Sequence, residues 1–429
     1  MTQNNFKEKL TKYLSINAMS RYEEPIVDEL KQNISPVYQV LRDKLGSVIF
    51  YKPSKYHNAP KVMIAAHMDE VGYIVRSISK TGQLLLSPIG GIWASTVIGT
   101  KAILKASSGK TFNGVFGHTS IHIMQSEKIA KALTNDELYA DFGFKDDKEA
   151  IDQGVEIGDP VFLSGETIYF ANEDLIGGKA MDNRAGVAIL ELIANELSNV
   201  DLKVDLYLVG TVQEEVGTRG ARSSVSLVKP DIAIALDTTS THDTIGTIPG
   251  TTALFKGAAI RVKDGGTLMD PKLIDIFMNI AQKYQIKAYK FVAAGGGTDA
   301  KELQYSPNGG AATLTLSLAQ RYLHSPIGVC AISDLLATSK LIIKFLEDFE
   351  EESYNILDIN CRITTFLHYF FNFFAQTVGV NHFFIFWFIL WIPLSQKKIT
   401  KKQTKKFFSS LATKLENLYI FWCFYCLKN

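Results

Sequence analysis

The chain has 429 residues, of which 46% are hydrophobic, and this size accommodates two domains or one large domain with an insertion. The net charge of +1 averages two unlike parts, because residues 1–353 carry 36 Lys or Arg against 42 Asp or Glu, whereas the remainder carries nine against two. The acidic body lacks the basic surface of a nucleic-acid-binding protein, so we expect no nucleic acid among its partners.

Cysteine usage and the first residues bear on the compartment. Only Cys330 of the four cysteines lies in the body, which excludes a disulfide framework there. The opening sequence MTQNNFKEKLTKYL carries charges where a signal peptide needs an apolar run. We therefore expect a cytoplasmic protein.

The first predicted elements are short. Residues 7–14 and 23–33 have the apolar spacing of helices, and residues 61–66 (KVMIAA) form an apolar run typical of a buried strand. Residues 73–165 differ, because short alternating segments are interrupted there by Gly, Ser and Asn. This texture indicates an all-β insertion.

Beyond the insertion, helical and strand patterns alternate. Residues 182–198 have helical periodicity, three apolar runs predict buried strands, and two amphipathic segments predict further helices. We therefore predict an α/β fold, with a mostly parallel sheet covered by helices on both faces. Residues 1–72 and 166–353 would form this discontinuous domain, with 73–165 inserted as a β-barrel-like domain. The runs are 204–212, 231–236 and 311–317 for the strands and 271–284 and 332–349 for the helices.

The composition changes abruptly at the tail, residues 354–429, which holds 13 of the 26 phenylalanines. Residues 363–396 contain no charged side chain other than histidine, and a lysine-rich stretch follows them. One interpretation is a membrane anchor, but the apolar core at 383–394 falls short of the roughly 20 residues that span a bilayer. The Phe, Lys, Ile and Asn bias also resembles translated AT-rich DNA, as after a frameshift, and we favour this artefactual origin.

Side chains suited to binding divalent ions lie in five segments. Four of these segments come shortly after a predicted strand. Open α/β sheets bind ligands at the carboxyl ends of their strands, so segments remote in sequence can converge there. The segments are His67-Met-Asp69-Glu70, Lys179-Ala-Met-Asp182-Asn183-Arg184, Gln213-Glu214-Glu215-Val-Gly217, Asp237, and Arg321-Tyr-Leu-His324-Ser325.

These residue types predict a site for two metal ions. Two imidazoles and three carboxylates suit zinc, cobalt or manganese, and do not indicate a thiolate site or a calcium site. Of these metals we expect Zn²⁺ or Co²⁺. A pair of ions about 4 Å apart needs a bridging carboxylate. Asp182, at the predicted start of a helix, is the natural bridge. His67 and Asp237 would complete one site, and Glu215 and His324 the other.

Two more carboxylates have predicted roles beside the ions. Hydrolysis needs a carboxylate that is not a ligand, to take a proton from water and return it to the leaving amine. Glu214, next to the ligand Glu215, is the candidate. Asp69 lies two residues after His67, where its carboxylate can accept the other imidazole N–H and orient the ring.

Substrate contacts are harder to assign. The glycine-rich segment 295–300 could cradle a substrate backbone through its amides, or could be only a flexible turn. His118 and His122 could also contact substrate, although we favour a structural role for both. The predicted substrate-binding residues are Gly296, Gly297, Thr298, Asp299 and Arg321.

At these positions the sequence resembles the glutamyl and deblocking aminopeptidases, the tetrahedral-complex type of di-zinc peptidase. The resemblance covers about residues 1–350 and implies a zinc-exopeptidase fold acting on short peptides. It also implies the ligand, bridge and base roles given above, a dimerisation role for the insertion, and a twelve-subunit shell with inward-facing active sites. The match runs through AHMDEVG (66–72), GGKAMDNR (177–184), QEEVGTRGA (213–221), ALD (235–237), GGTDA (296–300) and RYLHSP (321–326).

Several functions remain open beside a metallo-aminopeptidase that removes N-terminal residues. A deacylase would use the same metal pair. A glycosidase needs two carboxylates and no metal pair, and a non-catalytic shell protein would lack the base or a ligand, so both fit poorly. The N-terminal residue preference is not readable, although Lys256, Arg222 and Arg321 are basic candidates near the site. Overall likeness to the glutamyl type favours acidic residues.

Overall fold

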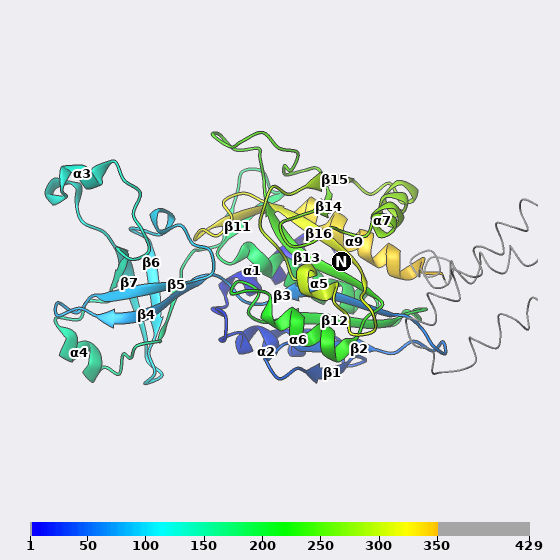
Figure 1. The fold of residues 1–429 in the computed structure, drawn as a ribbon, viewed down its shortest axis with the longest axis horizontal. Coiled ribbons are helices and arrows are strands. Elements are labelled where there is room, and N and C mark those ends of the chain that lie inside the picture. Colours follow the sequence, from blue (N-terminus) through cyan, green and yellow to red (C-terminus); the bar gives the residue numbers. More distant parts are fainter. Residues whose placement is uncertain (1, 351–429) are drawn as a thin grey trace, which may run out of the picture. The chain divides into compact units, whose positions relative to one another are not determined.

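The structure is a computed structural model that describes residues 2–350, drawn as a coloured ribbon in Figure 1. Within this range no helix is both long and apolar enough to cross a membrane. The two interpretations of residues 354–429 lie outside the described residues, so both stay predictions.

An eight-stranded mixed sheet forms the centre of the larger part (Figure 1). Its order is β1-β2-β12-β3-β13-β16-β14-β15, and the neighbours from β12 through β16 are all parallel, as are β14 and β15. The predicted α/β fold with a mostly parallel sheet is therefore confirmed. The strands are β1 (Gln39–Arg42), β2 (Val48–Lys52), β3 (Lys61–His67), β12 (Asp205–Thr211), β13 (Ile232–Ser240), β14 (Ala258–Lys263), β15 (Ala288–Val292) and β16 (Ala312–Gln320).

Helices cover both faces of this sheet. On one face α5 packs against β3 and β13 and contacts α1 and α9. Helices α6 and α8 contact each other and pack against β12 and β13, respectively. The apolar stripes of these helices and the strands form one continuous core, as the periodicity predicts. The helices are α1 (Gln3–Ser15), α2 (Glu24–Asn33), α5 (Met181–Glu196), α6 (Arg219–Val228), α7 (Pro271–Lys283), α8 (Ala300–Leu303) and α9 (Ile332–Glu347).

The all-β texture of residues 73–165 corresponds to a closed barrel with its own hydrophobic core. Its strand order is β4-β5-β8-β7-β6-β9, and the excursion between β7 and β8 carries the short helices η2 (Ile121–Ile123) and α3 (Ser126–Ile129). The barrel's role in dimerisation stays a prediction. The elements are β4 (Gly72–Ile78), β5 (Leu84–Ile89), η1 (Ala94–Thr96), β6 (Lys101–Lys105), β7 (Thr111–Gly117), β8 (Tyr139–Asp141), α4 (Asp147–Asp152) and β9 (Pro160–Leu163).

Some elements have no clear sequence signal. Strand β14 was missed because a buried arginine, Arg261, interrupts its apolar run. Helix α6 has a glycine in its first turn, and three serines and two arginines among its ten residues interrupt the apolar pattern. A small sheet was also missed, because its strands are too short for a periodicity to appear. It comprises β10 (Ile168–Tyr169), β11 (Leu175–Gly178) and β17 (Gly328–Ala331).

Candidate metal centre

Four adjacent parallel strands carry the predicted site at their carboxyl ends. His67 is the last residue of β3, and Glu215 follows β12, its neighbour in the sheet. Asp237 lies inside β13, which runs four residues further than the apolar run 231–236, and His324 comes four residues after β16. The arrangement places side chains from distant segments along one edge of the sheet, as open α/β folds do.

Asp182 reaches this edge from the start of α5. Its backbone angles are not helical, and regular helix begins only after Asn183. Asn183 Nδ2 donates to the carbonyl of Leu236, which ties the entry of the helix to β13 beside Asp237. Asp182 therefore lies just before the regular helix, where the positive end of the helix dipole favours its carboxylate.

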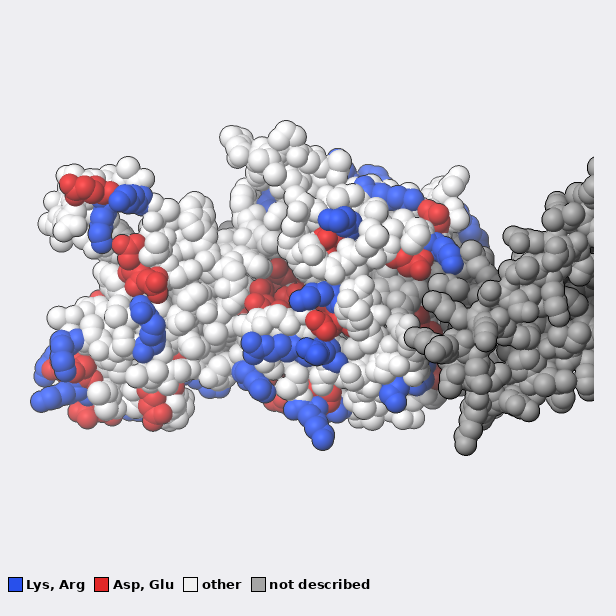
Figure 2. Space-filling view, viewed as in Figure 1, with Lys and Arg blue, Asp and Glu red and all other residues white. Residues whose placement is uncertain are grey.

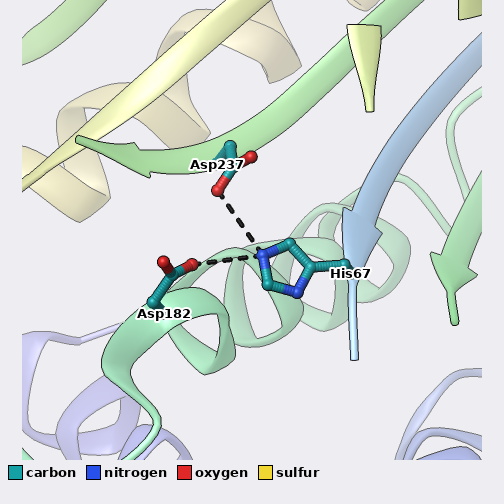
Figure 3. Close-up of side chains that lie close together, drawn as sticks. All are labelled: His67, Asp182 and Asp237. Carbon is teal, nitrogen blue, oxygen red and sulfur yellow. Dashed lines mark hydrogen bonds and ion pairs between the residues drawn. The ribbon is translucent and has the colours of Figure 1, made fainter. Parts of the chain in front are cut away.

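His67, Asp182 and Asp237 form the first of two side-chain clusters (Figure 3). Nε2 of His67 lies 3.1 Å from Oδ1 of Asp182 and 3.5 Å from Oδ1 of Asp237. All three side chains are at least nine-tenths buried. The group can offer one nitrogen and two carboxylate oxygens to a single point, which is a ligand set that Zn²⁺ or Co²⁺ accepts.

Asp182, Glu215 and His324 form the second cluster. Nε2 of His324 lies 3.2 Å from Oδ2 of Asp182 and 3.4 Å from Oε1 of Glu215. Asp182 therefore turns one oxygen toward each histidine, as a bridging carboxylate between two ions must. Oε1 of Glu215 is buried and has no hydrogen-bond partner among the described residues, so this acceptor is available to a cation.

Both imidazole rings have the orientation of metal ligands. Nδ1 of His67 lies 3.1 Å from the backbone carbonyl of Asp69, and Nδ1 of His324 lies 2.8 Å from that of Gly91. A carbonyl accepts only from N–H, so each Nδ1 carries a proton, and each Nε2, which faces the carboxylates, is the ring atom that would bind an ion. A hydrogen bond on the far nitrogen commonly fixes a metal-binding histidine.

The His324 partner comes from the barrel. Gly91 follows β5, and the neighbouring Gly90 has a left-handed φ of 81°. A Cβ atom at Gly90 would lie 2.7 Å from Val71 and 3.1 Å from Oε2 of Glu215. The barrel loop thus approaches the second cluster closely enough that only glycine fits at Gly90.

Electrostatics favour cation binding at the two clusters. Burial raises the pKa of Glu215 to about 8, with a further contribution from the negative charge of Asp182. Burial also raises the pKa of Asp237. Burial would raise the pKa of Asp182 too, but hydrogen bonds with His324 and His67 outweigh it and lower that pKa. Crowded carboxylates of this kind hold protons unless cations replace them, so the residues present fit divalent ions.

Glu214 lies beside both clusters and belongs to neither. Burial raises its pKa well above the ordinary value, and the charges of Asp237 and Glu215 add to this effect. Its backbone N–H donates to Oδ1 of Asp69 at 3.0 Å, and that of Glu215 to Oδ2 of Asp69 at 3.2 Å. The Asp69 carboxylate is farther from Nδ1 of His67, at 3.5 Å, than the Asp69 carbonyl is. Asp69 therefore holds the Glu214–Glu215 loop as well as orienting His67.

A cavity of about 1010 Å³ opens over the two clusters. Asp182, Glu214, Glu215 and Asp237 are the carboxylates among the described residues that line it. Figure 2 shows acidic side chains gathered in a hollow at the middle of the drawn face, beside basic ones. The remaining wall is largely apolar and carries the further cationic side chains Arg261, Lys290 and Lys301.

The predicted substrate-binding residues divide into two groups. Gly296 and Gly297 line the cavity, and a Cβ atom at either would meet nothing within 4 Å, so their backbone is open to it. Thr298 and Asp299 are buried behind the wall, where Asp299 accepts a hydrogen bond from Thr211. Arg321 does not line the cavity either, because its guanidinium pairs with Asp243 at 2.8 Å.

The other candidates also lie outside the cavity lining. His118 and His122 are exposed on the excursion between β7 and β8. Lys256 donates to the carbonyl of Thr251, and neither it nor Arg222 lines the cavity. Contact of these residues with substrate stays a prediction.

Sequence reasoning missed Arg261. Its buried guanidinium donates to Ser317 Oγ at 3.0 Å, to Asp264 at 3.1 Å and to the carbonyl of Thr238 at 3.1 Å. It therefore anchors the residue that follows Asp237 while its outer edge reaches the cavity. No motif surrounds it, and the only signal was a charged residue inside an otherwise apolar strand.

Comparison with protein families matches residues 46–341 to the family described as M42 glutamyl aminopeptidase. A glutamyl aminopeptidase of Lactococcus lactis is 32% identical over 347 residues, covering 80% of this chain and 97% of the relative. A lysyl aminopeptidase of Pyrococcus furiosus is 31% identical over 353 residues, covering 80% and 97%.

Solved structures give the same result. An aminopeptidase of Desulfurococcus kamchatkensis is 32% identical, with a TM-score of 0.76, and the match covers 83% of this chain and 98% of that one. The TET1 peptidase of Pyrococcus horikoshii, described as assembling into a tetrahedron or a large octahedral shell, is 28% identical with a TM-score of 0.72, covering 80% and 100%. The zinc-exopeptidase type of fold is therefore confirmed.

Proposed function

The chain belongs to the M42 glutamyl aminopeptidase family and is a metal-dependent aminopeptidase, and we propose that two divalent ions at the two clusters serve this activity. His67 and Asp237 would hold one ion, Glu215 and His324 the other, and Asp182 both. The carrying observation is that both Nε2 atoms face opposite oxygens of Asp182 while both Nδ1 atoms face backbone carbonyls. Zn²⁺ and Co²⁺ suit this ligand set.

When bound, such ions supply positive charge that activates water and polarises the scissile carbonyl. Glu214 accepts the proton of the attacking water and returns it to the departing amine. Its raised pKa suits a group that must hold this proton between the two steps. Asp69 keeps Glu214 in place through the backbone N–H of the loop.

A deacylase is the second candidate function, because the same carboxylates would serve it equally well. The two activities differ in whether a free substrate amine is required. We expect hydrolysis of peptides and aminoacyl-anilides with a free N-terminus, and no hydrolysis of N-acylated amino acids. The metal content of the protein is measured in the same assay. If the protein hydrolysed the acylated substrates preferentially, it would be a deacylase.

A preference for acidic N-terminal residues is supported by the charges in the cavity wall. Arg261 pairs with Asp264, and Lys290 pairs with Asp275 at 2.9 Å. Lys301 has no carboxylate partner among the described residues. An acidic substrate side chain would thus find a free ammonium group, and a basic one would find no acid outside the ligands and the base.

Aminoacyl-anilides with glutamyl, alanyl and lysyl groups test this preference. For Lys301→Glu we expect kcat/KM to fall about tenfold or more for the glutamyl substrate and to change little for the alanyl one. Lys290→Glu, at the already paired lysine, is the matched control. Equal losses on all three substrates would mean that Lys301 does not select them.

Assembly and location also belong to the proposal. Relatives of the TET type supply the model of a homododecamer, in which a closed shell would admit only flexible peptides to the active sites. Sedimentation of the metal-loaded protein tests it, and a monomer would refute it. The cytoplasm remains our expectation, supported by the free, buried thiol of Cys330.

A further inference from the structure

The loop that carries Glu214 and Glu215 has a backbone that must be held in place. Gln213 has φ of +56° and Thr218 has φ of +53°, so non-glycine residues occupy the left-handed region at both ends of the loop. Such residues cost free energy and persist only where the surroundings fix them. Whatever fixes this loop therefore also fixes the position of the proposed base.

Two buried carboxylates bind three successive N–H groups of the loop. Glu23 accepts from the N–H of Gln213 at 3.0 Å, and Asp69 accepts from those of Glu214 and Glu215. Glu23 is 5% exposed and lies directly before helix α2, about 190 residues away in sequence. Its segment also reaches Asp69 through Ser20, whose hydroxyl donates to Oδ2 at 2.6 Å.

Burying the Glu23 carboxylate costs folding free energy, so stability alone does not explain this residue. It forms no salt bridge with any described Lys or Arg, although the charge of buried Arg184 acts on it. Burial, with the charge of Asp69, raises its pKa to about 7 against backbone hydrogen bonds from Arg21 and Gln213 that lower it. A buried acid without a cation partner destabilises the fold in which it ionises. Residues that break a stability rule in this way are expected at functional sites.

We propose that Glu23 is a positioning residue for the reaction, which acts through the N–H of Gln213 to hold the Glu214 carboxylate in its working position. This rests on the proposed function only in taking Glu214 as the base. Misplacement of a catalytic group by about 1 Å costs on the order of 100-fold in rate. Loss of one of the three hydrogen bonds that hold the loop should therefore lower turnover without weakening substrate binding.

The test compares Glu23→Ala and Glu23→Gln with Glu29→Ala in the full chain. Glu29 is a buried acid on helix α2, which Glu23 precedes, but it contacts Asn33 and Lys12 and not the loop. We expect kcat of Glu23→Ala to fall at least about tenfold, with KM, metal content and melting temperature near those of the wild type. Glu23→Gln keeps an acceptor oxygen for the N–H and should recover part of the loss. Glu29→Ala should keep the wild-type kcat.

A double-variant cycle separates positioning from other roles. If Glu23 acts through Glu214, Glu23→Ala should cost less than about twofold in the background of Glu214→Gln. An equal loss in both backgrounds overturns the proposal, as does an unchanged kcat or a loss that tracks metal content or melting temperature. If Glu23→Ala does not fold, Glu23→Gln is carried through the same cycle. Wild-type turnover of Glu214→Gln alone would instead remove the base, and with it the proposed function.

Discussion

Exchange of each member of the Glu214–Glu215 pair for glutamine separates a base from a ligand. Glutamine keeps the size of the side chain and loses the proton acceptor, and neither substitution removes the backbone N–H groups that Asp69 binds. General acid–base catalysis contributes about 10²–10⁴-fold in rate. For Glu214→Gln we therefore expect a loss of about 2.7–5.5 kcal/mol in transition-state stabilisation, with the metal content intact.

Glu215→Gln should behave differently. Oε1 of Glu215 lies 3.4 Å from Nε2 of His324 and has no hydrogen-bond partner within residues 2–350, so an ion would lose the charge of this oxygen in the variant. A neutral amide is a poor ligand for a hard dication, and one of the two ions should be weakly held. Excess metal should restore part of this variant's activity and none of the activity of Glu214→Gln.

The assay measures turnover of an aminoacyl-anilide and metal content by elemental analysis, for both variants before and after addition of Zn²⁺ or Co²⁺. Near-normal turnover of Glu214→Gln would refute the proposed base. A metal-depleted Glu214→Gln protein with metal-replete Glu215→Gln protein would mean that the two adjacent carboxylates have exchanged roles.

Three further predictions concern the bridge, a surface pair and the tail. Asp182→Asn should lose affinity for both ions together, because one oxygen faces each histidine; loss of only one ion per subunit would contradict the bridge. Although burial raises it, hydrogen bonds from Arg321 and the backbone N–H of Leu254 lower the pKa of Asp243 to about 2, below its unfolded value, so this group stabilises the fold above pH 4 and progressively less as pH falls. Asp243→Asn should cost about 1–2 kcal/mol at pH 7 in denaturant unfolding, and the difference should shrink between pH 5 and 3. A chain ending near residue 352 should stay soluble and fully active, as sedimentation and turnover would show; loss of its fold would contradict the artefactual origin of the tail.

Much of the fold was predictable because its signals are local. The apolar runs of β3, β12, β13 and β16 are buried on both faces of the sheet, helix α5 is buried along most of its length, and α7 and α9 each bury one apolar stripe. Their patterns therefore follow from secondary structure alone. The β-rich insertion was equally visible, because alternation broken by turn residues is also a local signal. Strand β14 was not, since buried Arg261 finds its partners only in the folded chain.

The candidate site divides in the same way. The sequence alone determined the donor types, their chain order and their positions at strand ends, because these depend on residue identity and on a sheet whose parallel strands end at one edge. Only the tertiary structure decided that Asp182 faces both histidines, that Gly91 orients His324, and that Glu23 holds the loop of the base. It also decided that Arg321 pairs with Asp243 instead of lining the cavity. These contacts join residues that mostly lie more than 70 positions apart, and their partners are backbone groups or single side chains, which leave no periodic trace in the sequence.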